Sequence, residues 1–172
     1  MKNVIITGSS NGFGLKAAKD FADKGNKVFA TMRNPNGKNA NAKAELEAHS
    51  PNIKVVDMDV TNDASVKEAM STILAVAGNI DVLINNAGIM FIGITEAFSV
   101  EQAKFKMETN YFGAIRWMQA VLPAMQSFRF NYQLFFFGWF HHGTIFFHLC
   151  RILNMHWRLL FKVFVIMFFL LE

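Results

Sequence analysis

Eight residues near the amino terminus, Thr7-Gly8-Ser9-Ser10-Asn11-Gly12-Phe13-Gly14, decide the interpretation of this chain. They stand between a short apolar run, Val4 to Ile6, and an amphipathic segment from Phe13 to Lys24. Gly8 is expected to make the tight turn, Gly12 to let a ligand approach the backbone, and Gly14 to let strand and helix pack closely. Free N–H groups at the start of a helix stabilise phosphate charge. The stretch therefore predicts a phosphate-binding turn.

The side chains inside this turn support the same interpretation, because Ser9, Ser10 and Asn11 can add hydrogen-bond donors. The turn is not a P-loop, since no Gly-Lys-Ser/Thr sequence follows Gly12. A glycine loop with a purely structural role is the alternative. The position of the turn between a strand and a helix favours binding.

Strand-like and helix-like segments alternate from Met1 to Ser127. Short apolar strands joined by helical crossovers are typical of a parallel sheet that is covered on both faces. Ser99 is an N-cap candidate, and Gln102 completes a capping box. The fold class is therefore α/β, with a doubly wound parallel sheet. The predicted strands are Val4–Ile6, Lys27–Met32, Lys54–Met58 and Asp81–Ile84, and the predicted helices are Phe13–Lys24, Ala64–Val76 and Ser99–Met125.

The composition changes sharply near Ser127. Residues 128–172 contain 12 of the 19 phenylalanines, four of the five histidines and a single acidic residue, Glu172. Neither a helical nor a strand period persists there. We therefore divide the chain into a nucleotide-binding domain at residues 1–127 and an aberrant, aromatic-rich tail at residues 128–172.

Bulk properties limit the partners and the compartment. The net charge of +4 comes without a Lys/Arg-rich run, so no nucleic-acid partner is expected. Cys150 is the single cysteine, which excludes an internal disulfide, and the amino terminus lacks a signal-peptide core. We expect a cytoplasmic protein.

Two features of the tail invite other interpretations. The spacing of Cys150 and its neighbouring histidines matches no zinc pattern, so no metal site is expected. The apolar run Val163–Leu171 is shorter than the roughly 20 residues that a spanning helix needs. No membrane partner is expected, although such a segment could adhere to lipid or aggregate. The histidines in question are His141, His142, His148 and His156.

The glycine-rich turn and three later segments, in the same order, resemble the short-chain dehydrogenase/reductase family. The later segments are Asp57-Met58-Asp59-Val60, Asp81 to Gly88 with its Asn85-Asn86-Ala87-Gly88 end, and Glu108 to Gly113. The resemblance covers about three quarters of the chain. It implies a Rossmann-like sheet with strand order beginning 3-2-1-4, and an NAD(P) cleft lined by the turn and by Asn86, Ala87 and Gly88. It also implies that Asp59 and Val60 contact the adenine and that Asn110 is the active-site asparagine.

The end of the second predicted strand bears on which cofactor is bound. Family members that bind NAD typically carry an acidic residue there, which hydrogen-bonds the ribose hydroxyls. Here the sequence is Ala30-Thr31-Met32-Arg33-Asn34, without a carboxylate. Arg33 can pair with a 2′-phosphate through its planar guanidinium group, so NADP is preferred and NAD stays open. The alternative is that Arg33 is an ordinary solvated surface residue.

The resemblance also shows which chemistry is missing. In the family, a tyrosine is the acid/base, a lysine four residues later lowers its pKa, a serine positions the substrate oxygen, and the asparagine holds a water in a proton relay. Here Tyr111 is followed four residues later by Ile115, and Tyr132 by Phe136. No Ser-Ser pair follows a fifth strand. Asn110 is the one catalytic residue that carries over.

A one-base shift of the reading frame near Ser127 is our hypothesis for the tail. Degenerate codons for Phe135-Phe136 can yield Ser-Ser in the shifted frame, and those for Leu149 to Ile152 can yield Tyr-Ala-Ala-Ser. Those for Arg129 to Gln133 can yield Gly-Leu-Ile-Ile-Asn, which resembles the fifth strand of the family. Phe136 and Leu149 are 13 positions apart, as the serine and tyrosine are in the family. The lysine does not emerge in the same frame.

The expected function is NAD(P)(H)-dependent oxidoreduction of the short-chain type, with hydride transfer on a small-molecule carbonyl/alcohol pair. The chain as written is expected to be inactive, because the serine, tyrosine and lysine are absent. A non-catalytic nucleotide-binding remnant and a membrane-associated protein held by its apolar tail are the alternatives. A homo-oligomer is open if the fold is complete.

Overall fold

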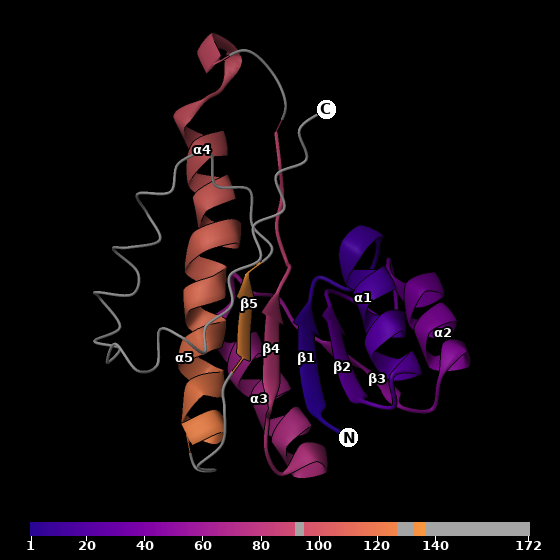
Figure 1. The fold of residues 1–172 in the computed structure, drawn as a ribbon. Helices are drawn as coiled ribbons and strands as arrows, with labels where there is room; N and C mark the ends of the chain where they lie inside the picture. The colour runs from indigo at the N-terminus through magenta and orange to yellow at the C-terminus, as the bar shows by residue number, and fades with distance from the viewer. Residues whose placement is uncertain (92–94, 127–132, 137–172) are drawn as a thin grey trace.

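The computed structural model of the chain describes residues 1–91, 95–126 and 133–136. Five parallel strands form one sheet in the order β3-β2-β1-β4-β5 (Figure 1). The predicted parallel sheet and its 3-2-1-4 order are confirmed. The strands are β1 (Asn3–Thr7), β2 (Lys27–Met32), β3 (Ile53–Asp57), β4 (Val82–Asn85) and β5 (Gln133–Phe136).

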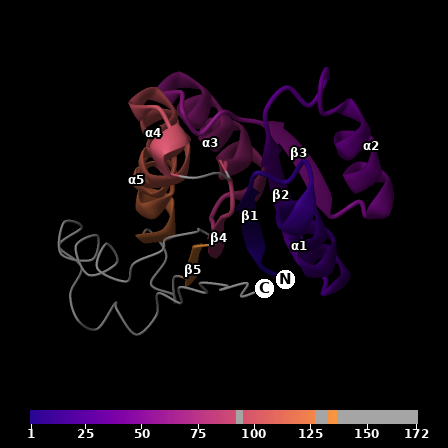
Figure 2. The same ribbon diagram turned by 90° about the horizontal axis from the view of Figure 1, so that it is seen from above.

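Helices cover both faces of the sheet. Helices α1 and α2 lie on one face, and α3, α4 and α5 lie on the other, as the two views show together (Figures 1 and 2). This is the doubly wound α/β arrangement that the alternation of segments predicts. The helices are α1 (Gly12–Asp23), α2 (Ala40–His49), α3 (Asp63–Ala77), α4 (Val100–Met107) and α5 (Gly113–Gln126).

The core has two layers because successive strand residues point to opposite faces. Along β1, Val4 and Ile6 pack with Ala18 and Ala22 of α1, whereas Ile5 packs in the opposite layer. Along β4, Leu83 shares that opposite layer, and Val82 and Ile84 face α1. Trp117 and Val121 of α5 fill the opposite layer together with Val66, Met70 and Ile73 of α3. Strands buried on both faces explain the unbroken apolar runs in the sequence.

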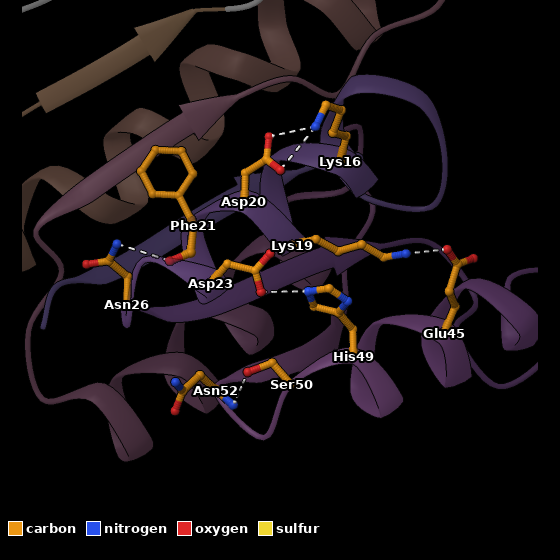
Figure 3. Close-up of polar contacts among 10 residues, drawn as sticks. All are labelled: Lys16, Lys19, Asp20, Phe21, Asp23, Asn26, Glu45, His49, Ser50 and Asn52. Atoms are coloured by element: carbon orange, nitrogen blue, oxygen red, sulfur yellow. Dashed lines mark hydrogen bonds and ion pairs between the residues drawn. The ribbon is translucent and has the colours of Figure 1, made fainter.

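Helix α2 is fixed to α1 mainly by polar contacts, which Figure 3 shows. Lys19 of α1 pairs with Glu45 of α2 at 2.6 Å, and His49 Nε2 lies 2.8 Å from Asp23 Oδ1. Leu46 is the buried residue of α2, and most of the other apolar residues of this helix are alanines. Two side-chain pairs one helical turn apart, together with the buried Leu46, therefore set the direction of α2 relative to α1.

The segment Ser99–Met125, which the sequence predicts as one helix, contains a π-helical turn. Ser99 caps α4 with Gln102 in the predicted capping box. The chain then widens into a π turn at Glu108–Phe112 before α5 begins at Gly113. The apolar spacing of a helix does not reveal where one extra residue enters a turn. This departure from one continuous helix matters because Asn110 lies within the π turn.

Three elements were not predicted from the sequence. They are α2, the short 3-10 helix Thr95–Ala97, and β5. Strand β5 falls within the segment assigned to the tail and pairs in parallel with β4, from Val82 with Gln133 to Asn85 with Phe136. The remaining tail predictions, including the histidine cluster, Cys150 and the apolar run Val163–Leu171, lie outside the described residues.

Among the described residues, no helix combines the length and the apolar character that crossing a membrane requires. Within those same ranges, His, Cys, Asp and Glu side chains form no group of three or more that could hold a metal ion.

Candidate functional site

A cavity of about 680 Å³ opens at the carboxyl edge of the sheet. The chain runs from β1 toward β2 on one side and later returns to β4 on the other side of β1, so the strand order reverses beside β1. Ligands of open α/β sheets bind at such a reversal. The lining residues are Gly8, Ser10, Asn11, Gly12, Phe13, Met32, Arg33, Asn34, Lys38, Asn39, Met58, Asp59, Val60, Asn86, Ala87, Gly88, Ile89 and Thr109.

The glycine-rich turn begins with a glycine that has no room for a side chain. Gly8 has a φ of +69°, and a Cβ atom built on it would lie 2.7 Å from the Cα of Ala87. A Cβ on Gly14 would overlap the side-chain amide of Asn86 and the carbonyl of Gly8. These two glycines therefore allow β1, α1 and the end of β4 to meet at van der Waals distance.

Gly12 differs from the other two glycines of the turn. Its φ is +53°, and a Cβ on it would meet no atom within 4 Å. Asn11 is the N-cap of α1, and its side chain makes no capping hydrogen bond. Helix geometry leaves the N–H groups of Gly12, Phe13 and Gly14 without intrahelical acceptors. The turn thus presents free N–H donors and an open backbone at the positive end of a helix dipole.

The ends of β1 and β4 are locked together beneath the turn by what we call the strand-end lock, formed by Thr7, Gly8, Gly14, Asn86 and Ala87. The buried hydroxyl of Thr7 accepts hydrogen bonds from the N–H groups of Asn86 and Ala87, both at 2.9 Å. The Asn86 side-chain amide donates to the carbonyls of Thr7 and Gly8, at 2.9 and 3.0 Å. The lock places Asn86 and Ala87 against the cavity.

Ser9 has a different place from the one that its hydroxyl suggests in the sequence. It is fully buried, its N–H donates to the carbonyl of Thr31, and its hydroxyl donates to the carbonyl of Ile6, both at 3.0 Å. Ser9 does not line the cavity. Its polar groups hold the turn to the sheet, which leaves Ser10 and Asn11 as the side-chain donors that line the cavity.

A second set of lining residues follows β2 and β3. Arg33, Asn34 and Lys38 come from the connection between β2 and α2. Asp59 and Val60 follow β3. Asp59 Oδ1 accepts from the N–H and the hydroxyl of Thr61, at 2.9 and 2.7 Å, so the described contacts of this carboxylate leave Oδ2 for a ligand.

Asn110 lies behind the cavity wall, where it binds the backbone of Ile89. Its Oδ1 accepts from the Ile89 N–H at 2.8 Å, and its Nδ2 donates to the Ile89 carbonyl at 2.9 Å. A Cβ on Gly88 would lie 3.4 Å from Asn110 Oδ1, so the Gly88 backbone packs on this amide. The side chain therefore fixes the segment that follows β4, while its neighbour Thr109 lines the cavity.

Arg116 joins the elements around the cavity in what we call the Arg116 cluster. Its guanidinium contacts Asp63 at 2.6 Å and Glu108 at 2.5 Å, and it donates to the Val60 carbonyl at 3.5 Å. Burial lowers the pKa of Arg116, but the hydrogen bonds and charges of Glu108 and Asp63 outweigh burial and raise its pKa above the ordinary value. The cluster therefore connects α3 and the π turn to Val60, the residue that follows Asp59.

Most of the predicted site residues meet at one cavity. Asn110, Thr7, Ser9 and Gly14 are not among the lining residues. Asn110, Thr7 and Gly14 each pack against or hold a residue that is, whereas Ser9 binds the carbonyls of Thr31 and Ile6. Sequence analysis missed several lining residues at strand ends and in the connections, namely Met32, Asn34, Lys38, Asn39, Met58, Ile89 and Thr109. Met32 could have been found as the last residue of a predicted strand, whereas Lys38 had no signal without the path of the β2–α2 connection.

Comparison with known curated proteins finds relatives that are named dehydrogenases and reductases. A 3-ketodihydrosphingosine reductase of Bacteroides thetaiotaomicron is 35% identical over 73% of this chain and 43% of its own length. Human retinol dehydrogenase 8 is 38% identical over 74% of this chain and 41% of its own. An NADP-dependent 3-hydroxy acid dehydrogenase of Salmonella typhi is 36% identical over 71% and 48%. The chain spans less than half the length of these relatives.

Solved structures share the fold. A short-chain dehydrogenase from Streptomyces avermitilis superposes with a TM-score of 0.72 and 29% identity, over 80% of this chain and 49% of that one. The aldohexose dehydrogenase of Thermoplasma acidophilum gives 0.66 and 31% identity, over 79% and 48%. The family model for short chain dehydrogenase matches residues 2–130. With its sheet order, glycine-rich turn and cavity, this chain belongs to the short-chain dehydrogenase/reductase family.

Proposed function

We propose that this chain holds NADP(H) in the cavity at the carboxyl edge of the sheet, as the nucleotide-binding part of an oxidoreductase acting on carbonyl/alcohol pairs. The observation that carries the proposal is the turn from Gly8 to Gly14, where free N–H groups and an open glycine face the cavity. A diphosphate needs both features, because its oxygens must reach the backbone itself.

The residues present fit the whole dinucleotide. The N–H groups of Gly12 and Phe13 would bind the diphosphate, and Asp59 and Val60 would take the adenine. Arg33, which lines the cavity, would supply the cation that binds a 2′-phosphate. Phe13, which is 66% exposed, offers an apolar ring beside the glycine turn. NADP(H) supplies a hydride when bound, and this chain orients it.

Proton transfer is what the described residues do not provide. In this chain the side-chain amide of Asn110 is already bound at both ends by Ile89, so it positions the cavity wall. No tyrosine in the sequence is followed four residues later by lysine. A carbonyl reduced at neutral pH needs an acid to deliver its proton. We therefore propose that this chain binds NADP(H) without catalysing hydride transfer. A form that carried the family's serine, tyrosine and lysine would act on a carbonyl/alcohol pair.

The relatives support the reaction class. Each relative cited above is named for a reductase or dehydrogenase activity on a ketone, an alcohol, a hydroxy acid or a sugar, and one is named NADP-dependent. Their substrates differ widely in size and polarity. The proposal is therefore limited to the carbonyl/alcohol pair that these substrates share.

The test of binding is calorimetric titration of the full chain with NADPH, compared between two variants. Gly12→Val places a side chain at the open face of the turn, and we expect NADPH affinity to fall at least about 100-fold because the diphosphate loses close approach. Gly25→Val is the matched control, since Gly25 also has a positive φ and free space around its Cα but lies outside the cavity. Equal affinity in both variants would contradict the proposed site.

The test of turnover uses the same protein with NADPH and a panel of ketones and aldehydes. We expect bound NADPH to remain unoxidised. Sequencing the DNA across codons 125 to 155 tests the frameshift hypothesis behind this expectation, and a shifted open frame that encodes the serine and tyrosine would support it. Oxidation of NADPH with production of alcohol by the chain as written would show that an acid exists elsewhere.

A further inference from the structure

The connection between β2 and α2 forms one end of the cavity. Within the seven residues between Met32 and Ala40, the chain contributes Arg33, Asn34, Lys38 and Asn39 to the lining. Two of these side chains are cations. The family resemblance concerns Arg33 alone, whereas the position of Lys38 in the lining follows from the path of the connection.

Hydrogen bonds give the connection a defined backbone conformation, which fixes the backbone position of Lys38. Asn34 adopts a left-handed φ of +48°, and its N–H donates to Asp57 Oδ1 at 3.0 Å. The N–H groups of Gly37 and Asn39 both donate to the Asn34 carbonyl at 3.2 Å. The Asn39 side chain donates to the Arg33 carbonyl at 2.6 Å, which closes the loop on itself.

Both ends of this connection are anchored. At one end, β2 lies inside the sheet between β1 and β3. At the other end, α2 is held to α1 by the Lys19–Glu45 and Asp23–His49 pairs (Figure 3). A side chain on a connection fixed at both ends loses less conformational entropy when it binds, so a ligand held there is bound more tightly.

The charges at this end of the cavity are available. In the described part of the chain, neither Arg33 nor Lys38 contacts a carboxylate, in contrast with Lys16, Lys19 and Arg116, which each do. Asp57 does not line the cavity and accepts the Asn34 N–H, whereas Asp59 lines the cavity and its Oδ1 accepts from Thr61. The lining cations therefore face the cavity without a competing anion from the connection itself.

We infer that Lys38 is a second specificity-determining cation, which acts with Arg33 to bind the 2′-phosphate that distinguishes NADP from NAD. The inference rests on the proposed function and deepens it. A phosphate dianion has three acceptor oxygens, more than a single guanidinium fork can bind in one plane. Lys38 supplies a point charge with three donors from a different position on the same connection.

The experiment measures the affinities of adenosine 2′,5′-bisphosphate and of AMP for the full chain. The two probes differ by the 2′-phosphate alone. We expect Lys38→Met to lower the affinity for the bisphosphate about tenfold and to leave AMP unchanged, because one charge-assisted contact is removed. Lys38→Arg is expected to keep most of the preference. Lys24→Met, which removes an exposed charge outside the cavity, is the matched control.

The outcomes separate this inference from the proposed function. If Lys38→Met keeps the wild-type ratio of bisphosphate affinity to AMP affinity, the proposed role of Lys38 is overturned, even if Arg33→Met lowers that ratio. Equal losses for AMP and for the bisphosphate would show that Lys38 shapes the connection instead of binding the phosphate, and would also overturn it. Failure of the unaltered chain to bind either probe would overturn the proposed function itself. A preference that weakens with added salt supports the charge-based assignment.

Discussion

The strand-end lock and the Arg116 cluster both fix the walls of the cavity, but they do so by different physics. The lock is neutral and its residues are buried or half-buried, with the buried Thr7 hydroxyl accepting two backbone N–H groups and Gly8 lying against Ala87. The Arg116 cluster is ionic and partly exposed, with Asp63 74% exposed. Removing the acceptor of a buried N–H lowers the free energy of unfolding more than separating an exposed ion pair does, because water then solvates the two separated charges.

The difference teaches where sequence changes are tolerated around the site. The lock supports the glycine-rich turn, so it combines a packing limit with a hydrogen-bond requirement. The Arg116 cluster connects α3, the π turn and Val60 from outside. We therefore expect changes in the lock to affect both folding and binding, and changes in the Arg116 cluster to affect folding slightly.

The largest effect is expected from Gly8→Ala. The left-handed φ and the overlap with the Ala87 backbone together should lower the free energy of unfolding by about 3 kcal/mol. Gly25→Ala has the same unfavourable φ but open space around it, and should cost about 1 kcal/mol. Urea unfolding of the two variants measures the difference. Equal costs would mean that the contact with Ala87 relaxes freely and that the lock is loose.

A smaller effect is expected from Thr7→Val, which keeps the shape of the side chain and removes its oxygen. The N–H groups of Asn86 and Ala87 then lose their acceptor, and unfolding should become easier by about 2 kcal/mol. Thr31→Val is the control, because the Ile6 carbonyl that Thr31 contacts also accepts from Ser9. Thermal unfolding compares them, and a cost for Thr31→Val as large as that for Thr7→Val would argue against a specific lock.

The smallest effect is expected from Arg116→Met. Because its partners Asp63 and Glu108 can turn toward water, the free energy of unfolding should fall by about 1 kcal/mol. NADPH affinity should stay within about threefold of wild type, since less than 0.7 kcal/mol of binding is at stake. Chemical unfolding and calorimetry on the same samples give both values. A loss of binding larger than the loss of stability would place Arg116 inside the binding machinery.

Sequence patterns were sufficient for the elements whose residues bury a clear face. The strands were found because Val4 to Ile6 and Val28 to Ala30 are short apolar runs, and the turn was found because glycine is required where backbones touch. The strand order followed from the family resemblance. The glycine argument expected a tight turn at Gly8, an open backbone at Gly12 and close packing at Gly14; the structure gives Gly8 a positive φ, leaves the space around Gly12 open and packs Gly14 against Asn86.

Other elements left no comparable signal. In α2 the apolar residues from Ala40 to Ala48 recur at every second position, which is the period of a strand, and contacts with α1 decide that it is a helix. The π turn around Asn110 adds a residue that an apolar pattern does not mark. The place of Lys38 in the cavity depends on a hydrogen bond between Asn34 and a neighbouring strand, which is a tertiary contact.

The most direct test of the account is an NMR titration of the isotope-labelled chain with NADPH, following the backbone amides of the glycine-rich turn. We predict saturable shifts of the Gly12, Phe13 and Gly14 amides at NADPH concentrations that also shift the Asp59 and Arg33 amides. NADPH that leaves the amides of the turn unmoved, in protein whose sheet resonances show it to be folded, would contradict the central claim.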